Sequence, residues 1–418
     1  MNLLITTNYY DPEQIGAGIW VTQLAHDLKA HGHEVTVVAS FPSYPLGRIF
    51  DGYRNRFADR KCVDGIDVIR TFTYATPNKS FRARCAGFGA FCLSAAPGYL
   101  RWRRRVDVVY AILPPLPLGI SAWVIAQASG AKLVINVQDI YPDIAIALNH
   151  LRNPAAVGLF RGMERWIYRR ADGIVVISEG FRQNLLGKGV PASKLHVVPN
   201  WADPDQILPG PPENAFRRKT GANGDLLVIY SGGLNHNAEL EPVIDAAAQL
   251  RDLPIRFALV GDGVQKQALM NRVEAARLDK VDFYPFQPLE QYGDILAASD
   301  VTLVTLNSAA TFASVPSKIY KQMAAARPII AIASRESELS GLIMDAQCGV
   351  VVPPGDPQRL ANVLRGALDQ RGAFVEMGRR GRLYLERNCS RNGCVARVEA
   401  ALAEACAEAH PRPVLAGV

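Results

Sequence analysis

The chain has 418 residues, 49% of them hydrophobic and 20% charged, so it is expected to fold into two or more packed domains. Its seven cysteines form no Cys-x-x-Cys pair. The odd count argues against a disulfide framework or a zinc site and for free thiols in a reducing cytoplasm. The net charge of +7 is uneven, because residues 1–200 hold 23 basic and 14 acidic side chains whereas residues 201–418 hold 23 and 25. The two halves are therefore expected to face different partners.

The first half of the chain alternates short apolar runs with helical patterns such as Ile19–His31 and Ala155–Ala171. The first apolar run has no basic leader and is too short for a signal peptide, so we expect a strand that enters a loop directly. The expected strands of this half are Leu3–Thr6, Glu34–Ala39, Val106–Ala111, Lys132–Val137, Gly173–Ile177 and Leu195–Pro199.

A glycine pair follows the first expected strand, in the stretch from Asp11 to Gly18 that leads into a helix. Gly16 and Gly18 would let the backbone approach a phosphate or a sugar closely. The spacing is not Gly-x-Gly-x-x-Gly, and a plain glycine turn is the alternative reading.

A basic and apolar segment lies within residues 68–106, which contain no acidic residue. The apolar run Cys85–Leu100 is too short to span a bilayer and contains Pro97. Basic residues on both sides and an interfacial tryptophan favour a segment in the headgroup layer of an anionic membrane, with an ordinary surface helix as the alternative. No nucleic-acid-binding motif accompanies the charge. The expected membrane residues are Arg82, Arg84, Arg101, Trp102, Arg103, Arg104 and Arg105.

The alternation of strands and helices restarts after a connection rich in proline and glycine, Pro204–Gly224. The expected strands of this half are Leu226–Ser231, Ile255–Val260, Val281–Tyr284, Val301–Thr305 and Ile329–Ala333. A helical tail, Glu376–Ala409, follows. This pattern predicts an α/β protein with two parallel, doubly wound sheets, whose ligands bind at the carboxyl ends of the strands and in the cleft between the domains.

Two glycine-containing loops follow successive strands of the second domain, Ser231–Asn235 and Val260–Gly263. Each signal is weak alone, but together they predict the mouth of a nucleotide pocket. The Gly-x-x-x-x-Gly-Lys-Ser/Thr loop of other nucleotide-binding proteins is absent, and so is any metal-ligand spacing.

The stretch from Ser314 to Pro328 predicts a short helix with Pro316 at its first position. Free N–H groups and partial positive charge at a helix start favour an acid there. This start carries Ser317, Lys318 and Lys321 instead, which predicts that it binds an anion from solution.

The chain resembles the family-4 retaining glycosyltransferases of the two-domain GT-B fold, in particular the colanic-acid, exopolysaccharide and O-antigen branch. The resemblance runs in family order over nearly the whole chain. The matching pieces are NYYDPEQIGAG (8–18), LKAHGHEVTVVA (28–39), QDIYPD (138–143), VVISEGF (175–181), VPNWAD (198–203), YSGGL (230–234), VGDG (260–263) and VPSKIY (315–320).

The resemblance implies two Rossmann-like domains that face a cleft. Residues 1–200 would bind a lipid-linked sugar acceptor at the membrane, and residues 201–385 would bind a nucleotide-diphosphate sugar. Residues 386–410 would form a helix that packs back toward the first domain. The enzyme would be cytoplasmic and peripheral on the inner face of the cytoplasmic membrane. It would need neither a metal nor another cofactor.

The resemblance also gives roles to individual residues, with Lys318 opposite the donor diphosphate and Asp139 orienting the sugar or the acceptor. Gln138 and Tyr141 are expected at the acceptor. His33 is read as structural. The expected donor-binding residues are Gly16, Gly18, Gly232, Gly233, Asn235, Gly261, Asp262, Gly263, Phe286, Ser317, Lys318 and Glu338.

The chain departs from the family at several of these positions. Two glutamates common in the family are replaced by Ala313 and Lys321, as they generally are in the colanic-acid-type branch. Glu336 or Glu338 is the candidate to bind the ribose in their place. Gln138 stands where many members have a histidine. An Arg and a Lys that often bind the pyrophosphate are also missing, and their region holds Gly233, Ala238 and Glu239.

Two other functions stay open. A nucleotide-sugar epimerase on the same fold would not need the basic segment, and donor epimerisation or hydrolysis without an acceptor would favour it. A catalytically inactive partner of another transferase is suggested by the missing glutamates and cations, and failure to bind any nucleotide would favour it.

Overall fold

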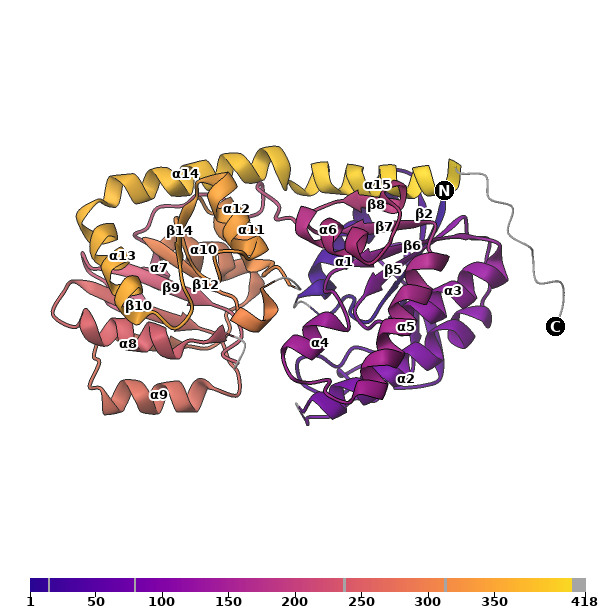
Figure 1. Ribbon diagram of the computed structural model, residues 1–418, viewed down its shortest axis with the longest axis horizontal. Coiled ribbons are helices and arrows are strands. Elements are labelled where there is room, and N and C mark those ends of the chain that lie inside the picture. The colour runs from indigo at the N-terminus through magenta and orange to yellow at the C-terminus, as the bar shows by residue number, and fades with distance from the viewer. Residues whose placement is uncertain (14–15, 79, 236–237, 312–313, 408–418) are drawn as a thin grey trace. The chain divides into compact units, whose positions relative to one another are not determined.

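The computed structural model describes residues 1–13, 16–78, 80–235, 238–311 and 314–407, and these form two compact units. The first unit comprises Met1–Pro199 and the chain from Val395 onward, and the second comprises Asn200–Cys394. The C-terminal helix therefore belongs to the first unit from Val395. Each unit is a sheet with helices on both of its faces (Figure 1).

The first unit has an eight-stranded sheet in the order β3-β4-β2-β1-β5-β6-β7-β8. Its strands are β1 (Asn2–Thr7), β2 (Glu34–Ser40), β3 (Ala58–Val63), β4 (Ile66–Thr71), β5 (Val108–Leu113), β6 (Lys132–Val137), β7 (Gly173–Val176) and β8 (Leu195–Val197). Its helices are α1 (Ala17–Ala30), α2 (Phe81–Leu100), α3 (Leu118–Ser129), α4 (Asp143–Ala147), α5 (Pro154–Arg170), α6 (Glu179–Gly187) and α15 (Arg391–Ala407).

The first sheet is not wholly parallel, which corrects the sequence prediction. Strands β3 and β4 form an antiparallel hairpin, which the sequence analysis missed. Its two-residue loop, Asp64 and Gly65, has positive φ at both positions, as a type I′ turn requires. Strand β3 lies at the sheet edge and has no buried residue, so it lacks the apolar run that reveals a central strand.

The second unit has a six-stranded parallel sheet in the order β11-β10-β9-β12-β13-β14. Its strands are β9 (Leu226–Ser231), β10 (Ile255–Val260), β11 (Val281–Tyr284), β12 (Val301–Thr305), β13 (Ile329–Ile332) and β14 (Gly349–Val352). Its helices are α7 (Ala215–Thr220), α8 (Glu241–Gln249), α9 (Lys266–Ala275), α10 (Tyr292–Ala298), α11 (Lys318–Ala324), α12 (Glu338–Ala346), α13 (Pro357–Asp369) and α14 (Arg371–Asn388). The sequence analysis missed β14, which has only four residues.

The two faces of the second sheet have separate cores, and β9 contributes to both. Val228 and Tyr230 pack in the cluster that contains residues of α8 and α13, whereas Leu227 and Ile229 pack in the cluster under α7 and α10. A central parallel strand is buried on both sides, so its whole length is apolar, which is why the sequence revealed it.

The helical tail expected over Glu376–Ala409 consists of two helices rather than one. Helix α14 ends at Asn388 and α15 begins at Arg391. Within the first unit, the Glu399 carboxylate of α15 contacts His33 Nε2 at 2.7 Å and His31 Nδ1 at 2.9 Å. His33 therefore has the structural role expected of it.

Candidate functional site

The carboxyl edge of the second sheet is the natural place for a ligand, because the strand order reverses between β9 and β12. The loops after β9 and β10 are joined there by backbone hydrogen bonds. Gly232 N donates to Val260 O, Leu234 N to Asp262 O and Gln265 N to Leu234 O, each at 2.9 Å. The two glycine loops expected to form a pocket mouth are thus one rigid unit.

Two of the expected donor-binding glycines are explained by this packing. A Cβ added at Gly261 would lie 1.9 Å from the Gly232 carbonyl oxygen, and φ there is +153°. A Cβ added at Gly263 would lie 2.3 Å from the Leu234 carbonyl oxygen. Both positions need glycine for close contact between the loops, whether or not a ligand is present.

Lys318 lies across the reversal point, against the glycines after β9. Its ammonium is 4.1 Å from the centroid of the Tyr230 ring, and a Cβ added at Gly232 would come within 2.7 Å of Nζ. The Tyr230 hydroxyl donates to the Gly233 carbonyl at 3.0 Å, which fixes the ring. Among the described residues no carboxylate forms an ion pair with Lys318, so its charge is available to an anion.

The helix that carries Lys318 is shorter than the sequence predicted. It spans Lys318–Ala324 with Ser317 at its N-cap, so the prediction that Pro316 occupies the first helical position is wrong. Pro316 instead accepts a hydrogen bond from Ile319 N at 3.2 Å. With only seven residues, the helix contributes little dipole, and the lysine side chain is the main cationic element.

Lys321, one turn later, occupies the position of a family glutamate. It is half-buried, its ammonium lies 5.1 Å from the centroid of the Tyr292 ring, and burial lowers its pKa. A second cation therefore lies on the same helix in place of the expected acid. The other glutamate position, Ala313, lies outside the described residues.

The remaining donor candidates are at the same edge but differ in exposure. Asn235, Asp262 and Phe286 are exposed, Phe286 by 51%, and Ser317 is exposed at the N-cap of α11. Glu338, the first residue of α12, is half-buried; burial raises the pKa of the Tyr320 phenol, and the charge of Glu338 adds to that effect.

In the first unit, the glycines after β1 have different explanations. Gly18 is buried, and a Cβ there would lie 2.2 Å from the Glu13 carbonyl oxygen. Gly16 has φ +57° and nothing within 4 Å of an added Cβ, so it is required by the backbone conformation alone. Gly16 is the N-cap of α1, whose first turn has no acidic residue.

Glu13 is a buried acid that the sequence analysis did not single out. It is 1% exposed, and its Oε1 accepts hydrogen bonds from Ser43 N at 3.0 Å and Tyr44 N at 2.9 Å. Burial raises its pKa, although these amide bonds and the nearby Arg70 guanidinium oppose the shift. An acid just ahead of a glycine pair was the available signal, but the sequence cannot show that it is buried.

Gln138, the residue after β6, begins a chain of polar contacts that runs back into the first sheet. Gln138 Nε2 donates to Asn136 Oδ1, and Asn136 Nδ2 donates to the Tyr110 hydroxyl, both at 2.7 Å. Burial, reinforced by the charge of Asp139, raises the pKa of Tyr141 to about 12. Asp139 and Tyr141 thus lie close together, and both are half-buried.

One face of the apolar run in the expected membrane segment belongs to the core. In α2, Phe91 is 0% exposed and Tyr99 is 0% exposed, so they pack inside the unit and cannot reach a membrane. Leu93, at 80% exposure, and Leu100, at 36%, are exposed, and Trp102 is half-buried. Lys79 lies outside the described residues. In the part of the chain that the structure describes, no helix combines the length and the apolar character needed to cross a bilayer.

The basic residues at the two ends of α2 have different environments. Arg104 Nη1 lies 3.5 Å from Asp67 Oδ2, Arg105 Nε lies 3.7 Å from Asp107 Oδ1, and Arg103 donates to the Ala128 carbonyl. Arg84, at the other end, lies near the phenols of Tyr9 and Tyr141 and lowers the pKa of both, against the larger effect of burial. A helix of 20 residues separates the two ends by roughly 30 Å.

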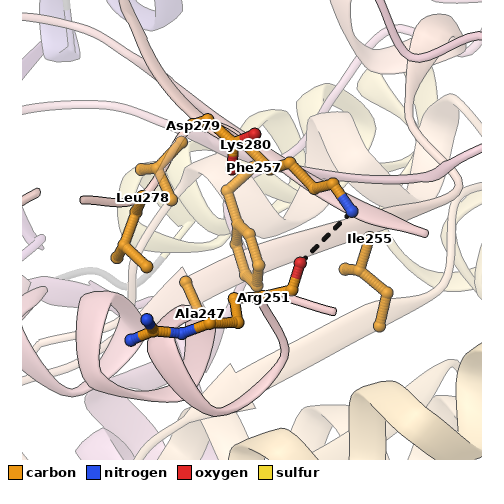
Figure 2. A pocket seen from close by; sticks show the side chains of 8 residues that line it. Ala247, Arg251, Ile255, Phe257, Leu278, Asp279 and Lys280 are labelled. Atoms are coloured by element: carbon orange, nitrogen blue, oxygen red, sulfur yellow. Dashed lines mark hydrogen bonds between the residues drawn. The ribbon is translucent and has the colours of Figure 1, made fainter. Parts of the chain in front are cut away.

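A small cavity in the second unit lies away from the carboxyl edge of its sheet. It is lined by residues at the amino ends of β10 and β11, among them Ile255, Phe257 and Val281 (Figure 2). Lys280 Nζ closes one side by donating to the Arg251 carbonyl at 3.3 Å. Its volume of about 10 Å³ has room for one water molecule at most, so it is a packing defect rather than a ligand site.

Comparison with known proteins agrees with these features. Residues 16–201 match the family model described as "Glycosyl transferase 4-like domain", and residues 212–384 match "Glycosyl transferases group 1". The chain belongs to the family-4 type of GT-B glycosyltransferases. The sequence prediction of the family and of its two-domain fold is therefore confirmed.

Two curated relatives and one solved structure illustrate the likeness. WcaI of Escherichia coli, named as a colanic acid biosynthesis glycosyl transferase, is 27% identical over 88% of this chain and 92% of its own. WbjE of Pseudomonas aeruginosa, named as a glycosyltransferase, is 29% identical over 62% of this chain and 66% of its own. The crystal structure of HepE from Anabaena with UDP-glucose superimposes with a TM-score of 0.71 at 15% identity, over 96% of this chain and 99% of that one.

Proposed function

We propose that this glycosyltransferase moves a sugar, with retention of configuration, from a nucleotide-diphosphate donor to a lipid-linked acceptor in the synthesis of a bacterial surface polysaccharide. The second unit would bind the donor and the first unit the acceptor. The name of WcaI supports the pathway, and the UDP-glucose bound to HepE supports the class of donor.

The observation that carries the proposal is the Lys318 ammonium beside Gly232, which forms no ion pair with a carboxylate of the described residues. It lies where the sheet order reverses, beside the glycine loop after β9, in which the Gly232 amide is already bonded to Val260 O. A diphosphate needs positive groups that are fixed before it arrives, because reorganising them during the reaction would raise the barrier. The Tyr230 ring holds the ammonium in such a position.

The proposed reaction needs no nucleophilic side chain, and we assign none. Departure of the nucleoside diphosphate builds negative charge, which the Lys318 ammonium would stabilise. The acceptor hydroxyl would attack from the same face, and a donor phosphate oxygen would help to take its proton. Asp139 would orient the sugar or the acceptor, and metal independence stays a prediction.

Location follows from the acceptor. A lipid-linked sugar is presented at the inner face of the cytoplasmic membrane, so we propose a cytoplasmic enzyme that binds this surface peripherally. The exposed basic residues of α2 support anionic lipid as the partner.

Lys318→Ala tests the donor site. We expect a ten- to hundredfold weaker affinity for UDP or the matching nucleoside diphosphate, because one charge-assisted contact contributes about 1.5–3 kcal/mol. Calorimetry should measure it after a thermal-shift screen of nucleotide sugars. Lys219→Ala is the control, since Lys219 also lies over a tyrosine, Tyr284, at 5.6 Å. Equal affinity of the Lys318→Ala variant and the unmutated enzyme would contradict the phosphate role.

The same preparation tests Asp139. The Asp139→Asn variant should keep its nucleotide affinity and lose transfer rate, because Asp139 lies in the acceptor unit rather than the donor unit. A normal transfer rate would show that Asp139 is peripheral. An unmutated chain that binds no nucleotide sugar would instead favour the inactive-partner alternative.

A further inference from the structure

A cluster of aromatic and basic side chains lies at the carboxyl edge of the first sheet, and the donor chemistry does not use it. The strand order of this sheet reverses between β1 and β5. Tyr9 follows β1, Tyr44 follows β2, and Tyr141 follows β6, so the three tyrosines surround this reversal point.

Tyr9 and Tyr44 form a tilted ring pair, with centroids 5.4 Å apart and planes at 50°. Tyr44 is 44% exposed although it belongs to this pair, so one ring remains open to a ligand. Arg84 lies near both Tyr9 and Tyr141 and is itself exposed. Apolar ring faces and a guanidinium are thus presented together.

The position of Tyr44 is fixed by the buried carboxyl group of Glu13. Glu13 is 1% exposed, and one of its carboxylate oxygens accepts hydrogen bonds from the amides of Ser43 and Tyr44. Burying an acid is unfavourable unless its hydrogen bonds are good, so this arrangement holds the loop in one conformation. A loop that served only as a connection would not need it.

A buried polar group points in the same direction. Asn8, directly before Tyr9, is 6% exposed, and its Oδ1 has no hydrogen-bond partner among the residues that the structure describes. Such orphaned oxygens are uncommon in native proteins, and a ligand donor is one way to satisfy them.

We propose that Tyr9, Tyr44, Tyr141 and Arg84 bind the head of the acceptor, a sugar ring joined to a phosphate or diphosphate. The tyrosines would contact the apolar face of the sugar, and the Arg84 guanidinium would bind the phosphate in bidentate geometry. Glu13 is the positioning residue for Tyr44. This inference rests on the proposed function and names the substrate class of its acceptor site.

The test uses soluble probes and the intact chain. Citronellyl diphosphate linked to glucose, galactose or N-acetylglucosamine is titrated by calorimetry, beside the phosphate-free citronellyl glycosides and inorganic pyrophosphate. We expect one diphosphate probe to bind at least tenfold more tightly than its phosphate-free partner and than pyrophosphate. The Arg84→Gln variant should bind the diphosphate probe about ten- to a hundredfold more weakly and lose that preference.

Tyr44→Ala should weaken both the diphosphate probe and its phosphate-free partner about fivefold, whereas Tyr44→Phe should stay within about twofold of the unmutated chain. Tyr74→Ala and Arg56→Gln are matched controls, because both residues are exposed in the same unit. UDP affinity should be unchanged in all of them.

Three results would overturn the proposal. The first is that no citronellyl probe binds to a chain that still binds UDP, and the second is that pyrophosphate binds as tightly as the diphosphate probe. The third is that the Arg84→Gln and Tyr44→Ala variants both bind the diphosphate probe as tightly as the unmutated chain. Loss of UDP binding in the unmutated chain would instead count against the proposed function.

Discussion

The carboxyl edges of the two sheets are built in opposite ways. The edge of the second unit is formed mainly by backbone, in glycine loops that amide hydrogen bonds join. The Lys318 ammonium lies over the Tyr230 ring beside them. The edge of the first unit is formed mainly by side chains, namely the buried Glu13, the buried Arg70 and a cluster of tyrosines. A rigid backbone that holds one ammonium in place suits the diphosphate that every nucleotide sugar shares, whereas a set of large side chains can differ from one acceptor to another.

The glycines after β9 and β10 allow the sharpest test of the backbone edge. Gly261 and Gly232 have nearly equal φ, +153° and +155°, but an added Cβ would meet a carbonyl oxygen at Gly261 and a lysine ammonium at Gly232. Strain at the backbone is thus matched, and only the neighbour differs.

Gly261→Ala should have the largest effect, on folding. The added Cβ would lie 1.9 Å from the Gly232 carbonyl, and the backbone cannot move without breaking the bonds between the loops. We expect a loss of about 3 kcal/mol or more, seen as a thermal midpoint lower by roughly 6–12 °C. Gly366→Ala is the control, since nothing lies within 4 Å of its added Cβ. Similar midpoints for the two variants would show that the loops are not tightly packed.

Gly232→Ala should lose less stability and more function. A lysine ammonium can swing away from the new methyl group, so the cost of the contact is small, but Lys318 leaves its position over Tyr230. We expect nucleoside-diphosphate affinity to fall about tenfold, within the range of one charge-assisted contact. Calorimetry on Gly232→Ala and on the double variant with Lys318→Ala decides it. Additive losses would mean that the two positions act independently.

What the sequence revealed also differs between regions. Central strands such as β9 and β10 were predicted at their observed bounds, because residues buried on both faces give continuous apolar runs. The edge strand β3, all of whose residues are exposed or half-buried, gave no such signal. Local patterns therefore located most of the inner strands but missed β4, and they found the edge strands β8 and β11 but missed the edge strands β3 and β14.

The same limit applies to the sites. Lys318 and Gly232 stand in motifs, so the sequence indicated both, although not that they touch. The burial of Glu13 depends on a loop 30 residues later, and no local pattern encodes that contact. Phe91 was assigned to a membrane surface because composition cannot distinguish a core face of α2 from an exposed one.

The two ends of α2 extend the comparison to the membrane. Replacing Arg101, Arg103, Arg104 and Arg105 with Ser should reduce binding to anionic vesicles, but by less than about 1 kcal/mol per residue, because Arg104 and Arg105 already face acids. Co-sedimentation at low and high salt measures it, and high salt should mimic the change. Four exposed arginines of the second unit, Arg359, Arg371, Arg379 and Arg387, replaced with Ser form the charge-matched control. Equal release of both variants would assign the binding to net charge rather than to α2.

Substitution of Glu13 should have the smallest effect on stability, and this effect should depend on pH. Burial raises its pKa in the folded state, so between the ordinary glutamate pKa and this raised value the folded chain binds more protons than the unfolded one. Stability from this group is therefore highest below the ordinary pKa and falls as the pH rises through that window. The Glu13→Gln variant lacks this dependence and loses about 1 kcal/mol for one weakened amide contact. The midpoint difference between the unmutated chain and the variant should thus shrink as the pH rises from about 4.5 to 7. A difference that grows over this range would mean that the carboxylate is stabilised by its amides and Arg70 more than burial destabilises it.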